Sequence, residues 1–442
     1  FALVAPLFVS APALADDAAS SDAADAADAA DTSSDAPLIL VVGQKDAPIT
    51  VVPRGLAISL SKENFEAVNA INVEDLMKYT PNFFVRKRFA GDDNAVVAMR
   101  GANTVQSART IVMVDGFVVS NFLGNRYDYP PKWNVVGPSE VRQFDIVYGP
   151  YSARYGGNSM GGVISVTTQE PKEGFSGSGT VQTMIMPFKE YGFDQTFTGY
   201  SIEGSLGYKQ KDGPWSVRAS FRHFENTGQS MTYNLLQKAT GTSTTSVTGA
   251  FVDPRLIRPS GLAANAETAV FGAASPVDVT QDQARLRIGY ETAGGWKIDA
   301  LGLIWKTRQD LLDPRSWLVN TTTGAPVYQG NVVFNGVTYN ASGLTMSQTW
   351  RTEYLAGLKL AGPLAGWDVA LNLSRFWIAS QDARSSNDYL TGAASTAGKQ
   401  TLSRTPGWYT GNLVVERTLG AHKLAFGADA NLYETSTDTY KT

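Results

Sequence analysis

The sequence has no cysteine and only two histidines, His223 and His422, among 442 residues. A chain without thiols forms neither a disulfide framework nor a thiolate metal site, and it has no cysteine nucleophile. Two histidines are also too few for a histidine-based zinc site and give little material for a Ser-His-Asp triad. We therefore expect no enzyme activity, no metal site and no bound cofactor.

Charge and long apolar runs are also scarce. Charged residues make up 18% of the chain, against roughly 25% in soluble domains, and the net charge of -4 argues against a nucleic-acid partner. No stretch approaches the roughly 20 apolar residues that a membrane helix needs. The 42 glycines and 11% aromatic residues instead favour many turns and many strands.

The N-terminal region has the pattern of an exported protein. Residues 1–15 resemble the apolar part of a secretory signal peptide, with Ala13-Leu14-Ala15 as its cleavage site. The absence of an initiator Met suggests that the sequence starts inside this signal; a frayed apolar N-terminus is the alternative. Residues 16–36 are almost entirely Ala, Asp and Ser, which predicts a disordered tether rather than an Ala-Asp helix, because the repeated acids would repel each other.

A short apolar run follows the tether, within residues 37–44. It consists of Leu38, Ile39, Leu40, Val41 and Val42, and Gly43 ends it. Such a run is either the first strand of the next domain or a strand that pairs with the sheet edge of a partner.

Residues 45–171 have mixed α/β character. Ser61 is a candidate helix N-cap, and residues 73–79 have a helical pattern that ends before Pro81. Short strands are predicted at residues 96–99, 143–148 and 163–168. Asp115-Gly116, between the apolar runs 110–114 and 117–119, predicts a hairpin with a type I′ turn.

Residues 172–442 show long segments in which apolar and polar residues alternate. Examples are Val217, Ala219 and Phe221 against Arg218 and Arg222. A soluble β-sandwich shows the same alternation, but segments of ten or more residues favour an antiparallel transmembrane β-barrel.

Two further features favour the barrel. Tight connections alternate with long ones, at about residues 225–282 and 380–406, which we expect to lack regular structure. Aromatic residues also lie near the segment ends, as in an interfacial girdle: Trp305, Trp350, Trp367, Trp377, Trp408 and Tyr409.

Ordered motifs before residue 171 resemble the plug domain of TonB-dependent outer-membrane receptors. Upstream they are Val73-Glu74-Asp75-Leu76, Thr80-Pro81, Met99-Arg100-Gly101 and Val114-Asp115-Gly116. Downstream they are Gly149-Pro150, Tyr155-Gly156, Gly161-Gly162-Val163-Ile164 and Thr167-Thr168. Because the blocks match in order and spacing over about residues 38–171, the resemblance is specific for the plug. Over the barrel it is one of pattern only.

The resemblance implies a mechanism and its partners. Leu38 to Gly43 would be the TonB box, to which the TonB energy-coupling protein adds as a strand. The receptor would lie in the lipid of the bacterial outer membrane and import a scarce nutrient, with an iron-siderophore chelate as the first expectation. Cobalamin, a carbohydrate and another metal complex stay open as ligands, and a passive porin or adhesin is the alternative class.

The resemblance also assigns plug residues. Arg100 would pair with acids of the barrel, although the family's later arginines are Gln143 and Tyr148 here, which leaves that ionic lock in question. The glycines Gly149, Gly156, Gly161 and Gly162 suit tight bends and positive φ. We expect these residues, with Gly101, Asp115, Gly116, Pro150 and Tyr155, to shape the plug rather than to touch ligand.

Two plug segments match the positions where the family binds ligand. We expect contacts from Arg88, Phe89, Asp92, Asp93 and Asn94, and from Arg126, Tyr127, Tyr129 and Trp133. Aromatic faces and Arg donors suit a chelate or a carboxylate, although the same side chains are also suited to packing the plug against the barrel. The barrel loop at residues 231–234 is a further candidate. Since family barrels have about 22 strands and we count about eight to ten, the sequence predicts an incomplete barrel.

Overall fold

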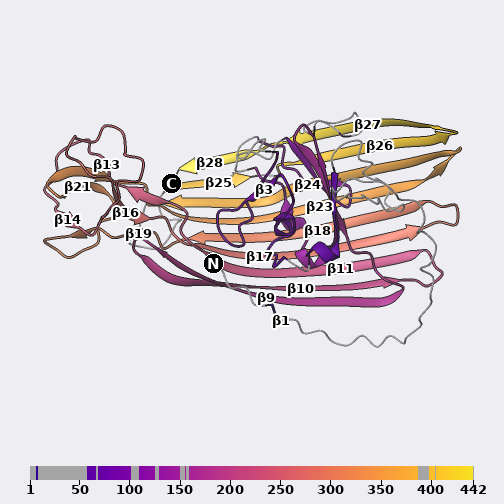
Figure 1. Cartoon of the computed structure of the whole chain (residues 1–442), viewed down its shortest axis with the longest axis horizontal. Helices are drawn as coiled ribbons and strands as arrows, with labels where there is room; N and C mark the ends of the chain where they lie inside the picture. The colour runs from indigo at the N-terminus through magenta and orange to yellow at the C-terminus, as the bar shows by residue number, and fades with distance from the viewer. Residues whose placement is uncertain are drawn as a thin grey trace, which may run out of the picture.

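The computed structural model describes residues 6–7, 57–65, 68–100, 109–124, 129–149, 155, 159–386, 398–403 and 405–441. The predicted signal peptide (apart from residues 6–7), the tether and the run Leu38 to Gly43 lie outside the described residues, as do Gly101, Arg126, Tyr127, Pro150 and Gly156. Within the described parts, a small α/β body lies against one face of a long, curved antiparallel sheet (Figure 1). We call these the plug and the wall.

The plug is built on a five-stranded sheet. Its strand order is β2 (Ala57–Leu60), β7 (Val141–Tyr148), β8 (Gly162–Thr168), β5 (Thr110–Val114) and β6 (Phe117–Val118). Strands β5 and β8 are parallel, and the other neighbours are antiparallel. A separate hairpin joins β3 (Phe83–Arg86) to β4 (Val96–Met99). The predicted strands therefore exist, with bounds that differ by a few residues.

The helices of the plug are short. They are α1 (Lys62–Phe65), η1 (Val73–Met77), η2 (Trp133–Val135) and η3 (Pro138–Glu140), the last three being 3₁₀ turns. The predicted helix over residues 73–79 is thus a five-residue 3₁₀ turn, whose start is fixed because Asp75 accepts the backbone N–H groups of Ile71 and Asn72. None of the helices in the described ranges has the length and apolar character needed to cross a membrane.

The hairpin of β5 and β6 has the predicted turn. Asp115 has φ 50° and Gly116 has φ 83°, so both central residues are left-handed as a type I′ turn requires. The turn points the Asp115 carboxylate towards Thr168, at the end of β8: the Thr168 N–H lies 2.9 Å from Oδ1 and the Thr168 hydroxyl 2.8 Å from Oδ2. The turn therefore ties the C-terminal ends of the parallel strands β5 and β8 together.

The wall contains nine strands of 13 to 20 residues in the described part of the chain. Each of these strands pairs with the next one along the chain, and the short β1 (Pro6–Leu7) pairs with the first of them. The strands are β9 (Gly174–Glu190), β10 (Phe193–Lys209), β11 (Trp215–Gly228), β17 (Val277–Glu291), β18 (Lys297–Leu311), β23 (Met346–Leu364), β24 (Trp367–Ser386), β26 (Gly407–Leu419) and β27 (His422–Glu434).

The polar face of the wall is turned towards the plug. On β11 and β17, Arg222 and Arg285 are 5% and 6% exposed, whereas Phe221 and Leu286, on the opposite face, are 54% and 45% exposed. A soluble sandwich would bury the apolar face instead. The alternation therefore places apolar side chains outside and polar side chains inside, as in a membrane barrel. This arrangement confirms the predicted fold class.

Two of the predicted girdle aromatics point inward. Trp305 is 3% exposed in the core that the plug shares with the wall. Trp408 is 1% exposed, stacks on Phe376 at 4.4 Å between ring centroids, and donates its Nε1–H to the Val118 carbonyl of the plug at 3.2 Å. The girdle prediction is wrong for these two residues, because position near a strand end does not decide which face a side chain takes.

The connections differ between the two ends of the wall, as predicted. At one end the turns are tight, as at residues 210–214, 292–296 and 365–366; at the other, β11 is followed by residues 229–276 and β18 by residues 312–345. We call these the tight-turn end and the long-loop end.

The prediction that the long connection at residues 225–282 lacks regular structure is wrong. The connection after β11 pairs with the one after β18 at the long-loop end (Figure 1). The two share a core that includes Leu236, Phe271, Leu318 and Tyr339. The apolar residues of this core come from two distant segments, so neither segment alone showed a period.

The short strands at the long-loop end are β12 (Tyr233–Leu235), β13 (Gln237–Lys238), β14 (Val247–Thr248), β15 (Phe251–Val252), β16 (Ala269–Ala273), β19 (Arg315–Ser316), β20 (Val319–Asn320), β21 (Gly330–Phe334), β22 (Val337–Ala341), β25 (Lys399–Ser403) and β28 (Thr437–Lys441).

Candidate functional site: the plug–wall seam and the plug apex

Buried ion pairs join the plug to the wall. Arg285 of β17 pairs with Asp115 at the tip of the plug hairpin, and both side chains are 4% exposed. Arg285 also lies 3.7 Å from the Glu140 carboxylate of η3. Burial alone would raise the pKa of Asp115, but the nearby cations Arg285, Arg287 and Lys359 hold it well below its ordinary value. Asp115 therefore stays ionised and fixes the hairpin to the wall.

A second pair has the opposite polarity. Lys132 of the plug lies 2.6 Å from the Glu353 carboxylate of β23, and the two side chains are 8% and 0% exposed. The Lys132 ammonium also lies over the rings of Trp305 and Phe376, at 5.9 and 5.4 Å from their centroids. Burial lowers the pKa of Lys132, and Glu353 opposes that shift. A third pair joins Arg351 of β23 to Asp93 at 3.0 Å.

Arg100 does not make the predicted contact. Its backbone has φ 52°, its Nη1 lies 3.4 Å from the Gly149 carbonyl, and its guanidinium lies 5.8 Å from the Tyr148 ring centroid. Among the described residues no acid of the wall pairs with it. The left-handed backbone directs this side chain back onto the plug. In the described part of the wall, the arginines that pair with acids of the plug include Arg285 and Arg351.

Gly161 and Gly162 do not have the predicted positive φ. A Cβ at Gly162 would lie 2.0 Å from the Met99 sulfur and 2.8 Å from the Val147 carbonyl. A larger residue would not fit at these positions, because the chain here packs tightly against its neighbours. The role of these glycines is therefore close packing. By contrast, Gly116 does have the positive φ of a turn.

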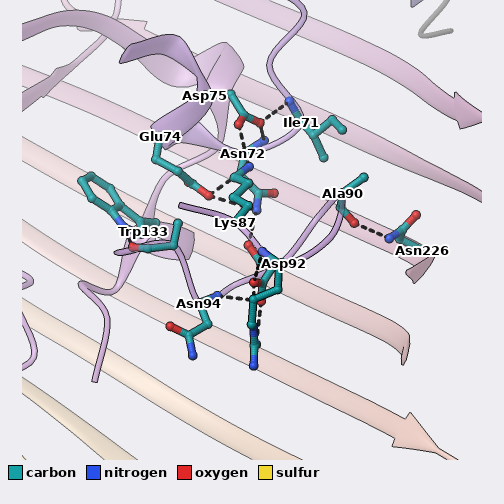
Figure 2. Close-up of polar contacts among 12 residues, drawn as sticks. Ile71, Asn72, Glu74, Asp75, Lys87, Ala90, Asp92, Asn94, Trp133 and Asn226 are labelled. Atoms are coloured by element: carbon teal, nitrogen blue, oxygen red, sulfur yellow. Dashed lines mark hydrogen bonds and ion pairs between the residues drawn. The ribbon is translucent and has the colours of Figure 1, made fainter. Parts of the chain in front are cut away.

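The segment 86–94 forms an apex of the plug near the long-loop end of the wall. Asn226 of β11 donates to the Ala90 carbonyl at 2.5 Å (Figure 2), and Gln229 donates to the Arg88 carbonyl at 3.2 Å. Arg88 makes two bonds to the Asp92 carboxylate, from Nε at 2.8 Å and from Nη2 at 2.7 Å. The segment is thus closed on itself and hydrogen-bonded to the wall.

A buried polar cluster beneath the apex was not predicted. Lys87 lies 3.1 Å from the Glu74 carboxylate and 2.7 Å from that of Asp75, and Asn72 donates to the Asp92 carbonyl at 2.9 Å (Figure 2). Burial raises the pKa of Glu74, against the opposing effect of Lys87. The wall joins the same cluster, since Arg222 donates to the Ile71 carbonyl at 2.8 Å. The sequence carried no signal for this cluster, because its residues come from two separate plug segments, 71–75 and 87–92, and from the wall.

Several predicted ligand contacts are turned inward. Trp133 is 1% exposed and donates to the Ala95 carbonyl; Phe89 is 5% exposed and packs in a cluster with Phe224; Asp92 is fully buried. Asp93 is held by Arg351 and Gln309 of the wall. In this conformation these four side chains are not available to a ligand. Each of them is apolar or hydrogen-bonded within the seam. They therefore pack the plug against the wall, which was the alternative to ligand contact.

Other predicted contacts stay accessible. The side chain of Arg88 is 34% exposed, and Asn94 and Tyr129 are half-buried. Tyr233, in the loop at residues 231–234, belongs to an aromatic cluster at the long-loop end: Tyr191, Phe193, Tyr233, Phe251 and Trp317. Most of this cluster could not be predicted from the sequence, because its rings come from three separate connections and from the start of β10. No group of three or more metal-ligating side chains occurs in the ranges that the structure describes.

Comparison with known proteins gives a consistent result. Residues 52–163 match the family model described as the TonB-dependent Receptor Plug Domain. The chain is 34% identical over 103 residues to the ferric enterobactin receptor PirA of Pseudomonas aeruginosa, which covers 22% of this chain and 14% of that protein. It is 26% identical over 185 residues to the iron-regulated outer membrane virulence protein of Vibrio cholerae, covering 40% and 26%. The matched regions thus span only a minor part of these relatives.

Among solved structures, P. aeruginosa FpvA bound to heterologous pyoverdines aligns with a TM-score of 0.52 and 11% identity, over 91% of this chain and 54% of that chain. At this identity the likeness supports the fold alone.

Proposed function

Because the chain carries the plug domain of the TonB-dependent receptors, we propose that it is the plug and part of the barrel of a receptor that imports an iron chelate across the bacterial outer membrane. Residues 45–171 form the plug in this proposal, and residues 172–442 form the barrel wall. Its partners are the TonB energy-coupling protein, the lipid of the outer membrane and a small chelate ligand.

The observation that carries this proposal is the buried seam. Arg285–Asp115, Lys132–Glu353 and Arg351–Asp93 hold the plug on the polar face of the wall. Removing one partner of such a pair costs about 3–5 kcal/mol because the other charge is left buried without a partner, so each pair specifies one position of the plug on the wall. A passive pore has no need of such a seam, whereas a transporter driven by external work does.

An iron chelate is the proposed cargo because two matched relatives are named as a ferric enterobactin receptor and an iron-regulated outer membrane protein. Its binding site would lie at the long-loop end, between the exposed edge of the apex and the aromatic cluster. Arg88 supplies a cation there, and Tyr129 and Tyr233 supply flat aromatic faces.

The run Leu38 to Gly43 is the proposed TonB box. Deleting these six residues from the full-length receptor should abolish uptake of radiolabelled ferric siderophores in cells, while binding of the same chelates at the cell surface persists. Deletion of residues 24–29, in the Ala/Asp-rich tether, is the length-matched control and should leave uptake nearly unchanged. Uptake that survives the loss of residues 38–43 would refute the coupling role and would favour passive diffusion.

A further inference from the structure

A cavity of about 320 Å³ lies between the plug and the wall near the tight-turn end. Its plug side is formed by the Asp115–Gly116 turn, by β8 and by Arg142 of β7; its wall side includes Lys209, Ser216 and Lys297, which flank tight turns. We call this the seam cavity. Its volume falls within the range of small-molecule sites, roughly 300–1,000 Å³.

Cations outnumber acids around the seam cavity. Six basic side chains line it, namely Arg142, Lys209, Arg218, Arg287, Lys297 and Lys359, against four acidic ones, namely Asp115, Glu170, Glu291 and Asp299. The acids are already engaged: Asp115 with Arg285, Asp299 and Glu170 with Arg287, and Glu291 with Lys297. None of the four remaining cations has a carboxylate partner within the described ranges: Lys209 flanks a tight turn, and Arg142, Arg218 and Lys359 lie in the seam.

These three cations are built into the seam rather than left on the surface. Arg218 is 9% exposed; its Nη2 donates to Ser205 at 2.9 Å, but its Nε is buried without a hydrogen-bond partner. The Nε of Arg142 is also buried without a partner, at a point where the pairing of β7 with β8 shifts register. Such a bulge redirects a side chain.

Lys359 completes the set from the wall. It is 8% exposed, and its ammonium lies 5.4 Å from the Phe117 ring centroid. A Cβ at Gly116 would lie 3.3 Å from its Nζ, so the Lys359 head group sits directly against the hairpin turn. The two buried Nε–H groups of Arg142 and Arg218 are costly unless an anion or water satisfies them, and the Lys359 ammonium lacks a carboxylate partner in the described ranges.

We propose that the seam cavity binds a small multivalent oxyanion, a phosphate or a short polycarboxylate, held by Arg142 of the plug together with Arg218 and Lys359 of the wall. Such an anion neutralises cations from both bodies and accepts several charge-assisted hydrogen bonds at once. It therefore adds to the buried ion pairs that hold the plug in the wall. The site lies away from the apex, and it does not depend on which chelate the receptor imports.

Equilibrium dialysis of the full-length receptor in a sugar-based detergent tests the proposal, with radiolabelled inorganic phosphate in one arm and radiolabelled citrate in the other. We expect saturable binding of at least one anion. Lys359→Met and Arg218→Met should each weaken it about tenfold, since each removes a charge-assisted hydrogen bond. The arm that binds more tightly tells phosphate from carboxylate.

Matched controls lie on the opposite face of the wall. Lys306 and Arg308 of β18 are exposed there, and Lys306→Met and Arg308→Met should leave binding unchanged. Lys359→Arg, which keeps the charge, should retain binding and so distinguishes loss of charge from misfolding. The proposal is overturned if neither anion binds saturably to the wild-type receptor, or if the Met variants of Lys359 and Lys306 bind equally well.

A second measurement uses stability. An anion that binds only the assembled seam should raise the thermal midpoint of the wild-type receptor in proportion to the logarithm of its concentration. The same shift in Arg218→Met as in the wild type would also overturn the proposal.

Discussion

Arg285, on the inner face of the wall, forms an ion pair with Asp115, at the tip of the plug hairpin, and Thr168 holds the same carboxylate from the plug side. The pair is buried, and the two residues are 170 positions apart in the chain. One turn of the plug is therefore fixed at once to its own sheet and to the wall.

Replacing Asp115 by Asn tests this contact. Asn tolerates the left-handed backbone of the turn, so the variant removes charge with little backbone strain and leaves the buried Arg285 with only the more distant Glu140 carboxylate, at 3.7 Å. We expect the plug to lose about 3–5 kcal/mol of stability. Because the chain has no cysteine, a single dye attached to Tyr79→Cys, an exposed plug position, reports plug unfolding in urea.

The control for this pair is exposed. Lys189 lies 2.6 Å from Asp194, with 79% and 75% of the two side chains accessible. Asp194→Asn should cost less than about 1 kcal/mol, as exposed pairs do. The double variant Asp115→Asn with Arg285→Met should lose less than the sum of the single variants; strict additivity would mean that the two residues do not interact.

Glu74 should make plug stability depend on pH. Its pKa is raised by burial from 4.5, so the folded plug holds a proton that the unfolded chain releases between pH 4.5 and the raised value. The stabilisation is fully present below pH 4.5 and is lost as the pH rises through the folded-state pKa. The thermal midpoint of the wild type relative to Glu74→Gln should therefore rise as the pH falls. A pH-independent difference between the wild type and Glu74→Gln would contradict the prediction.

Gly162 and Gly302 form a matched pair of strand glycines. A methyl group at Gly162 would collide with Met99 and the Val147 carbonyl, whereas one at Gly302 would meet nothing within 4 Å. We expect Gly162→Ala to destabilise the protein by about 1–3 kcal/mol through overpacking, and Gly302→Ala to change stability by less than about 0.5 kcal/mol. Urea unfolding of both variants measures the difference, and equal effects would contradict the assigned packing of β8.

Leu286 tests which face of the wall meets lipid. It is 45% exposed in the middle of β17, opposite Ala219 of β11. Leu286→Arg should cost about 2–4 kcal/mol when the full-length receptor folds into lipid vesicles, as an arginine does near the bilayer midplane. Leu286→Phe keeps the position apolar and should be nearly neutral. A tolerated arginine would show that this face is not in contact with lipid.

The sequence by itself determined the local features of this protein. The period-two alternation of β11 and β17 and the left-handed turn at Asp115-Gly116 depend on neighbours within a few residues, and both are found where they were predicted. The order of the plug motifs identified the domain, because turns and tight packing restrict which residues can occupy positions that are close together in the chain.

Only the tertiary structure decided which charges meet. The family resemblance assigned an acid of the barrel to Arg100, but the backbone conformation of Arg100 turns it onto the plug. The strand register of β17 instead brings Arg285 to Asp115. Trp133 and Asp92 were predicted at the ligand for their chemistry, yet they are buried within the seam. An ion pair or a buried face depends on distances between segments that are far apart in the chain, and local residue patterns do not encode those distances.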